Sequence, residues 1–102
     1  MQTADSERPI LVTPRRLVAE TRLEFRRAAL EYLDDATRRN AGRLILDMQG
    51  TTEIDASGLG VLVLLQKRAR ERMVATKLLR APVAVKQMLH LTKLDYLFEL
   101  EG

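Results

Sequence analysis

The segment Leu44–Leu62, which reads LILDMQGTTEIDASGLGVL, indicates the fold of this chain more strongly than any other. Its first five residues, Leu44–Met48, are almost continuously apolar, which is typical of a strand buried on both faces in a parallel sheet that helices cover. The loop Gly50–Glu53 follows this strand. The run Gly58–Leu65 is apolar all round and continues into charged residues, so it predicts the buried half of a helix that ends near Arg72.

The rest of the chain continues this alternation of strands and helices. Short apolar runs bounded by turn residues predict strands, and apolar residues at helical spacing predict helices. The expected order favours right-handed crossovers and a single sheet with helices packed against it. The expected elements are strand Ile10–Thr13, helix Thr21–Arg39, strand Leu44–Met48, helix Gly58–Arg72, strand Val74–Leu79, helix Pro82–Lys93 and strand Tyr96–Leu100.

The helix expected at Thr21–Arg39 has the clearest amphipathic pattern. Thr21 and Glu24 have the spacing of a capping box, in which two side chains satisfy free N–H groups of the first turn. Asn40 or Gly42 can take the left-handed conformation that ends a helix. The residues expected to face the core are Leu23, Leu30 and Leu33, with Ala29, Tyr32 and Ala36 beside them.

Length and composition predict one small domain. The chain has 102 residues, of which 46% are apolar and 30% charged, enough for one hydrophobic core. We expect a polar tail at residues 1–9 and one domain at residues 10–102. There is no cysteine, which fits a reducing compartment, and no apolar run approaches the roughly 20 residues of a membrane span. These features favour a cytoplasmic protein that does not insert into a membrane.

Charge and aromatic content argue against direct nucleic-acid binding. The net charge is +3, and the 17 basic residues are interspersed with 14 acidic ones instead of forming one stripe. There is no Trp, whereas proteins that bind single strands stack bases on aromatic side chains. A solvated surface is the first interpretation of the basic residues, and a patch for an anionic partner is the second.

Motifs of the common enzyme classes are absent from the sequence. It contains no GxGxxG after a strand, no P-loop, no HExxH and no GxSxG. The single histidine, His90, is expected on the polar side of a short helix, and the adjacent acids Asp34 and Asp35 are expected in solvent. Since no spacing brings three or four metal-ligating groups together, we expect no metal, no cofactor and no enzymatic activity.

Asp55–Leu62 is the one dense group of unusual residues. Asp55 or Ser57 can cap the free N–H groups of the helix that begins here. Gly58 and Gly60 are poor helix formers, and two of them in one turn indicate close backbone packing or a partner that approaches closely. The same turn presents N–H groups and a hydroxyl at one point of the surface, which suits protein docking and tolerates a phosphate.

Asp55–Leu62, placed after the apolar strand Leu44–Met48, resembles the signature of STAS domains, the family of bacterial anti-sigma-factor antagonists. Leu78–Val85 and Leu91–Phe98 are similar to the last strand–helix–strand of that family, so the resemblance covers about Ile10–Leu100. It implies an α/β fold, a single STAS-like domain whose central sheet has about four strands with helices packed on it. The family's first strand and last helix are expected to be missing or very short.

The resemblance implies a switch protein that works through protein–protein contacts. Antagonists of this family bind an anti-sigma factor, commonly a serine kinase, and so free a sigma factor and regulate transcription. An alternative is an accessory subunit of a phospholipid ABC transporter or of a stress-signalling complex, and a third class is a nucleotide- or lipid-binding module. A shortened sheet edge also leaves room for a homodimer. The residues implied in partner binding are Thr52, Glu53, Asp55, Ala56, Ser57, Gly58 and Gly60.

Ala56 departs from the family pattern at the regulatory position. The family kinase phosphorylates a serine directly after the motif aspartate, and the added charge breaks the complex by repulsion and desolvation. Here the residue after Asp55 is Ala56, which has no hydroxyl. Ser57 stands at the family's second hydroxyl position, where helix capping is the first interpretation and phosphorylation the weaker second.

Overall fold

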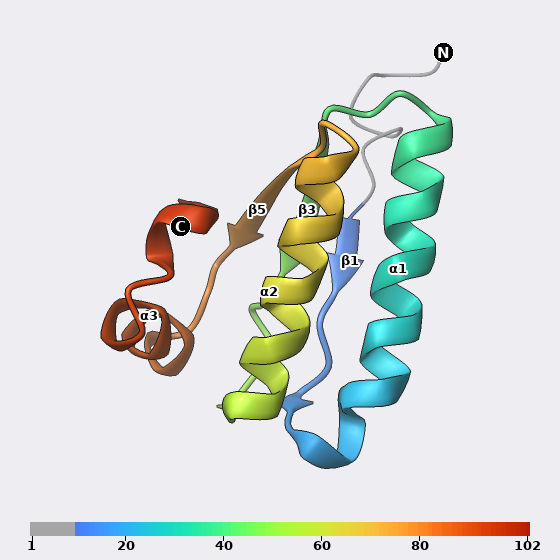
Figure 1. Ribbon diagram of the computed structural model, residues 1–102. Coiled ribbons are helices and arrows are strands. Elements are labelled where there is room, and N and C mark those ends of the chain that lie inside the picture. Colours follow the sequence, from blue (N-terminus) through green and yellow to red (C-terminus); the bar gives the residue numbers. More distant parts are fainter. Residues whose placement is uncertain (1–9) are drawn as a thin grey trace.

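A four-stranded parallel sheet forms the centre of the computed structural model, which describes residues 10–102 (Figure 1). Its strands lie in the order β1-β3-β5-β6, and every neighbouring pair is parallel. The expected α/β fold, a sheet of four strands with helices packed on it, is confirmed. The strands are β1 Ile10–Val12, β3 Arg43–Asp47, β5 Ala75–Leu79 and β6 Glu99–Glu101, and the helices are α1 Arg22–Arg38, α2 Ala56–Glu71 and α3 Val83–Leu91.

The order of the strands determines where the helices lie. The chain crosses the sheet in one direction, so right-handed crossovers put successive connecting helices on the same face. Figure 1 shows α1 and α2 side by side in front of the sheet, with α3 beyond the end of β5. The register aligns Leu11, Leu46, Leu78 and Leu100 in one row across the sheet, and the first three belong to the hydrophobic core.

Helix α1 faces the core with most of the expected residues, since Ala29, Leu33 and Ala36 are buried and Leu30 packs against the core. Leu23 is 67% exposed and Tyr32 is 39% exposed, so the expectation that Leu23 faces the core is wrong. Phe25 precedes Ala29 by one turn and Leu33 by two, and this row takes the side of the helix that packs against the sheet. The buried residues of α1 are Phe25, Ala29, Leu33 and Ala36.

The start of α1 also differs from the expected capping box. The Thr21 side chain makes no capping hydrogen bond to α1. Its Oγ1 accepts from the N–H of Val18 at 3.1 Å and donates to the carbonyl oxygen of Arg16 at 2.6 Å. A 3₁₀ turn at Ala19–Thr21 precedes the helix and directs this hydroxyl back into the loop, so the reciprocal pairing with Glu24 does not form.

Most other element boundaries agree with expectation, and the last strand is the main exception. A 3₁₀ turn covers Asp95–Leu97 and β6 begins only at Glu99, so the strand expected at Tyr96–Leu100 begins too early. Strand β6 begins where its pairing with β5 begins, and the apolar composition of the sequence does not show this position. Helix α2 begins at Ala56, two residues earlier than expected, and Asn40 has the left-handed φ of 56° expected after α1.

Strand β3 confirms the interpretation of the central apolar run, since Leu44, Ile45 and Leu46 are all buried.

The polar tail expected at residues 1–9 lies outside the described residues. Within residues 10–102, none of the helices has the length and apolar character needed to cross a membrane.

Candidate functional site

Asp55 is the N-cap of α2 and joins the start of this helix to the loop before α1. One carboxylate oxygen accepts from the N–H of Gly58 at 3.0 Å, and the other accepts from the N–H of Ala19 at 3.1 Å. The hydrogen bond from Gly58 is the main cause that lowers the pKa of the Asp55 carboxyl below its ordinary value of 3.8, although desolvation acts against it. The Asp55 carboxylate therefore holds the turn in place, and its lowered pKa keeps it ionised to a lower pH than an ordinary aspartate.

A second, two-stranded pair holds this turn from the other side. Strands β2 (Arg16–Leu17) and β4 (Glu53–Ile54) pair in parallel. The N–H of Thr52 donates to the carbonyl oxygen of the residue before β2 at 2.8 Å, and the N–H of Asp55 donates to that of Leu17 at 3.1 Å. The sequence predicted only a loop here, because strands of two residues carry no readable apolar periodicity.

Gly58 and Gly60 lie on opposite sides of the first turns of α2. Gly58 is buried, and a Cβ atom there would overlap with the carbonyl oxygen of Leu17 and lie 2.7 Å from the carbonyl carbon. Gly60 is exposed, and a Cβ atom there would have nothing within 4 Å. Close backbone packing thus explains Gly58, whereas Gly60 leaves an open surface.

The open side of α2 forms a hollow of about 430 Å³ with the start of α1. Leu23, 67% exposed, stands in it between two arginines of its own helix. Among residues 10–102 the half-buried Ser57 has no side-chain hydrogen bond, so the cap expected at Asp55 or Ser57 is made by Asp55. This α1–α2 surface is lined by Arg22, Leu23, Arg26, Ser57, Gly60, Val61 and Leu64.

Most of the residues expected to bind a partner lie together and are accessible. Thr52, Glu53, Ala56 and Gly60 are exposed, and Asp55 and Ser57 are half-buried. Gly58 is the exception, because Leu17 covers it. Sequence reasoning missed that Leu23 of α1 lines this hollow, because the pattern alone does not say which of two overlapping apolar stripes faces the sheet.

The titratable residues considered for chemistry lie away from this turn. His90 is exposed, with Nδ1 at 3.9 Å from Asp95 Oδ2. Asp34 pairs with Arg72, and Asp35 pairs with arginines at the end of α1. Within residues 10–102 there is no group of three or more His, Asp or Glu side chains arranged to hold a metal ion.

The family model described as "Mlab, STAS domain" matches residues 4–99 of the chain. The chain belongs to the STAS domain family. The solved structure of a Thermotoga maritima protein, provisionally assigned as an anti-sigma factor antagonist, is similar with a TM-score of 0.72 and 21% identity over 91% of this chain and 79% of that chain. The comparison with curated proteins found no significant match. The family expected from Asp55–Leu62 is thus confirmed, and the structural likeness extends to the fold.

Proposed function

We propose that this STAS domain is a partner-binding module that binds an anti-sigma factor in the cytoplasm and so regulates transcription. The observation that carries the proposal is the exposed Leu23 beside the open Gly60, at the turn held by Asp55. Large apolar side chains in a concave, accessible site are typical of protein-docking surfaces. The Thermotoga maritima structure supports the same class of function by its assignment. No catalytic step is needed for this role.

The chemistry of the α1–α2 surface suggests what the partner presents. Arg22 and Arg26 lie one turn apart on α1 and flank the apolar Leu23. A partner segment with an apolar side chain for the hollow and carboxylates at its edge would match this arrangement, since complementary charge speeds and orients association. We include Thr52, Glu53, Asp55, Ala56, Ser57 and Gly60 in the contact surface and assign Gly58 to packing.

The substitution Gly60→Arg tests the position of this surface. The new side chain would fill the hollow, while the open space around Gly60 lets the fold tolerate it. Gly42→Arg is the matched control, because Gly42 is equally open but lies at the opposite end of β3 from the Asp55 turn. Binding of a purified anti-sigma factor should weaken at least about tenfold for Gly60→Arg and stay unchanged for Gly42→Arg. Equal affinities of the two variants would place the interface elsewhere.

Regulation by phosphorylation is expected to be absent from the wild-type protein. Ala56 offers no acceptor, and the next hydroxyl, Ser57, lies at a different angle around the helix. After incubation with the cognate kinase and ATP, mass spectrometry should find no phosphate on the wild type and partial phosphorylation of Ala56→Ser. Stoichiometric phosphate on Ser57, accompanied by loss of partner binding, would instead assign the switch to Ser57.

A second candidate uses the same surface to bind another subunit, such as the ATPase of a phospholipid ABC transporter. The match to the STAS family model is compatible with both candidates, because its description names no partner. A pull-down with the tagged domain from its own cell extract separates the two candidates. Recovery of an anti-sigma kinase supports the first, and recovery of an ABC ATPase supports the second.

A further inference from the structure

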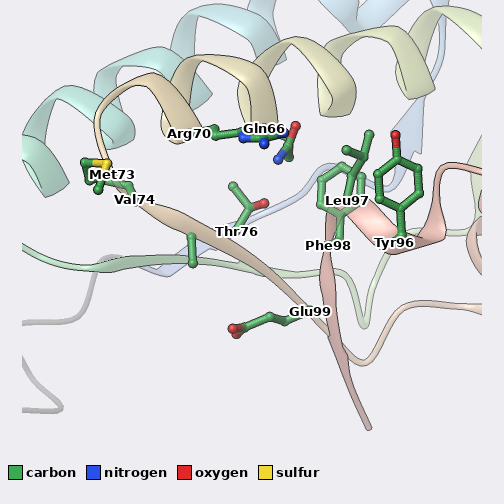
Figure 2. A pocket seen from close by; sticks show the side chains of 10 residues that line it. Gln66, Arg70, Met73, Val74, Thr76, Tyr96, Leu97, Phe98 and Glu99 are labelled. Carbon is green, nitrogen blue, oxygen red and sulfur yellow. The ribbon is translucent and has the colours of Figure 1, made fainter.

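A second hollow, separate from the α1–α2 surface, lies beside the C-terminal half of α2. Its volume is about 410 Å³, and an adjoining hollow of about 590 Å³ shares four of its residues. Figure 2 shows Gln66 and Arg70 reaching from α2 above Thr76 of β5, with Leu97 and Phe98 opposite. This α2–β6 hollow is lined by Gln66, Arg70, Met73, Val74, Ala75, Thr76, Tyr96, Leu97, Phe98 and Glu99.

One polar side chain at the base of the hollow is buried without a partner. Thr76 is 4% exposed, and its Oγ1 has no hydrogen-bond partner. Gln66 is 8% exposed and lines the same hollow, but among residues 10–102 only Thr76 has a fully buried side-chain oxygen or nitrogen without a partner. Buried hydroxyl and amide groups are nearly always satisfied in folded proteins, because an unmade hydrogen bond is costly. The unsatisfied Thr76 hydroxyl at this hollow therefore points to a ligand that supplies the missing contact.

The charged groups around the hollow favour an anion. Arg70 has no carboxylate partner among residues 10–102, and Lys67 lies one turn earlier at the adjoining hollow. The carboxylate of Glu99 is already occupied, since Arg43 donates to it at 2.8 and 3.3 Å. Glu71, at the edge of the adjoining hollow, is the remaining acid. Arg70 is thus available for a bidentate pair with a carboxylate.

We infer that the α2–β6 hollow binds a small apolar carboxylate. The Arg70 guanidinium pairs with the carboxylate, and the Gln66 amide and the Thr76 hydroxyl, which line the same hollow, donate to it. The apolar body of the ligand lies against Phe98 and Tyr96, and the hollow has the volume of ordinary small-molecule sites. This inference is independent of partner docking, because none of these residues lines the α1–α2 surface.

Naphthalene-2-carboxylate is a suitable probe, and naphthalene-2-carboxamide is its neutral match in size. Titration followed by NMR should show binding of the carboxylate with the largest shifts at Thr76 and Phe98. The amide should bind at least about tenfold more weakly, because it offers Arg70 no charge.

Three variants test the residues. Arg70→Gln should weaken carboxylate binding about tenfold or more, whereas Arg68→Gln, the same change on the same helix outside the hollow, should leave it unchanged. Thr76→Val should weaken binding and raise the melting temperature of the free protein, since it removes the unsatisfied hydroxyl. A lower melting temperature would show that Thr76 has an internal partner.

The inference fails if the carboxylate does not bind at about 1 mM, the weak end of specific binding. It fails equally if the amide binds as well as the carboxylate, or if Arg68→Gln weakens binding as much as Arg70→Gln. None of these outcomes bears on the anti-sigma-factor experiment, because Gly60→Arg leaves the hollow intact.

Discussion

The two sides of the first turns of α2 differ sharply, although Gly58 and Gly60 are only two residues apart. Gly58 is pressed against the backbone of Leu17, so the fold requires a glycine there. Gly60 faces open space, so the fold makes no such demand. The two glycines look equivalent in the sequence motif. Backbone packing requires a glycine at position 58, whereas position 60 lies on an open surface where packing makes no such demand.

The tight side follows from the hydrogen bonds of Asp55. Its N–H donates to Leu17, and its carboxylate accepts from Ala19 and Gly58. These bonds draw the segment before α1 against the start of α2, and only a residue without a side chain fits between the two backbones. Among residues 10–102 no comparable hydrogen bond joins the open side to a neighbouring segment, so packing does not restrict the residue at position 60.

The largest effect is expected from Gly58→Ala. The added methyl group meets backbone atoms of Leu17, which move only if β2 separates from α2. The free energy of unfolding should fall by about 3 kcal/mol, the upper part of the usual range for overpacking. Urea denaturation of the purified variant measures this loss. A wild-type midpoint would show that the two backbones are not in contact in solution.

A smaller effect of opposite sign is expected from Gly60→Ala. Its new methyl group meets nothing, and alanine loses less conformational freedom than glycine when a helix forms. The free energy of unfolding should rise by about 0.5–1 kcal/mol in the same urea experiment. Destabilisation at this position would remove the distinction between the two sides.

The smallest effect is expected from the charge of Asp55, and it depends on pH. Asp55→Asn keeps one accepting oxygen but loses the charge and the second acceptor, so only the part of the difference that changes with pH reports ionisation. Because the pKa is lowered in the folded state, the charge stabilises the protein above about pH 3.8 and this gain is lost as pH falls through the folded pKa. Thermal melts should show the wild type above the variant at pH 7 and the gap closing below pH 4. If the difference in melting temperature were the same at every pH, it would come from the geometry of the cap and not from the charge.

The sequence predicted the architecture well because β3 and the α2 motif carry strong local signals. It misplaced Leu23 because two apolar stripes overlap on α1, and only the position of the sheet selects the one that contains Phe25. The pairing of β2 with β4 depends on residues more than thirty positions apart, so no local pattern reveals it. The position of Leu23 at the candidate surface was not foreseen either, because it depends on which stripe of α1 faces the sheet.

The succession of strands across the sheet has a consequence for synthesis on the ribosome. Because the spatial order β1-β3-β5-β6 is also the order of translation, each strand can add to an edge that is already complete when it emerges. No earlier pair has to open to admit a later strand. Until β6 arrives, however, β5 is an unpaired edge that can recruit a strand from another chain. The interval in which β5 has left the ribosome and β6 has not is therefore the one in which this edge is most exposed to aggregation.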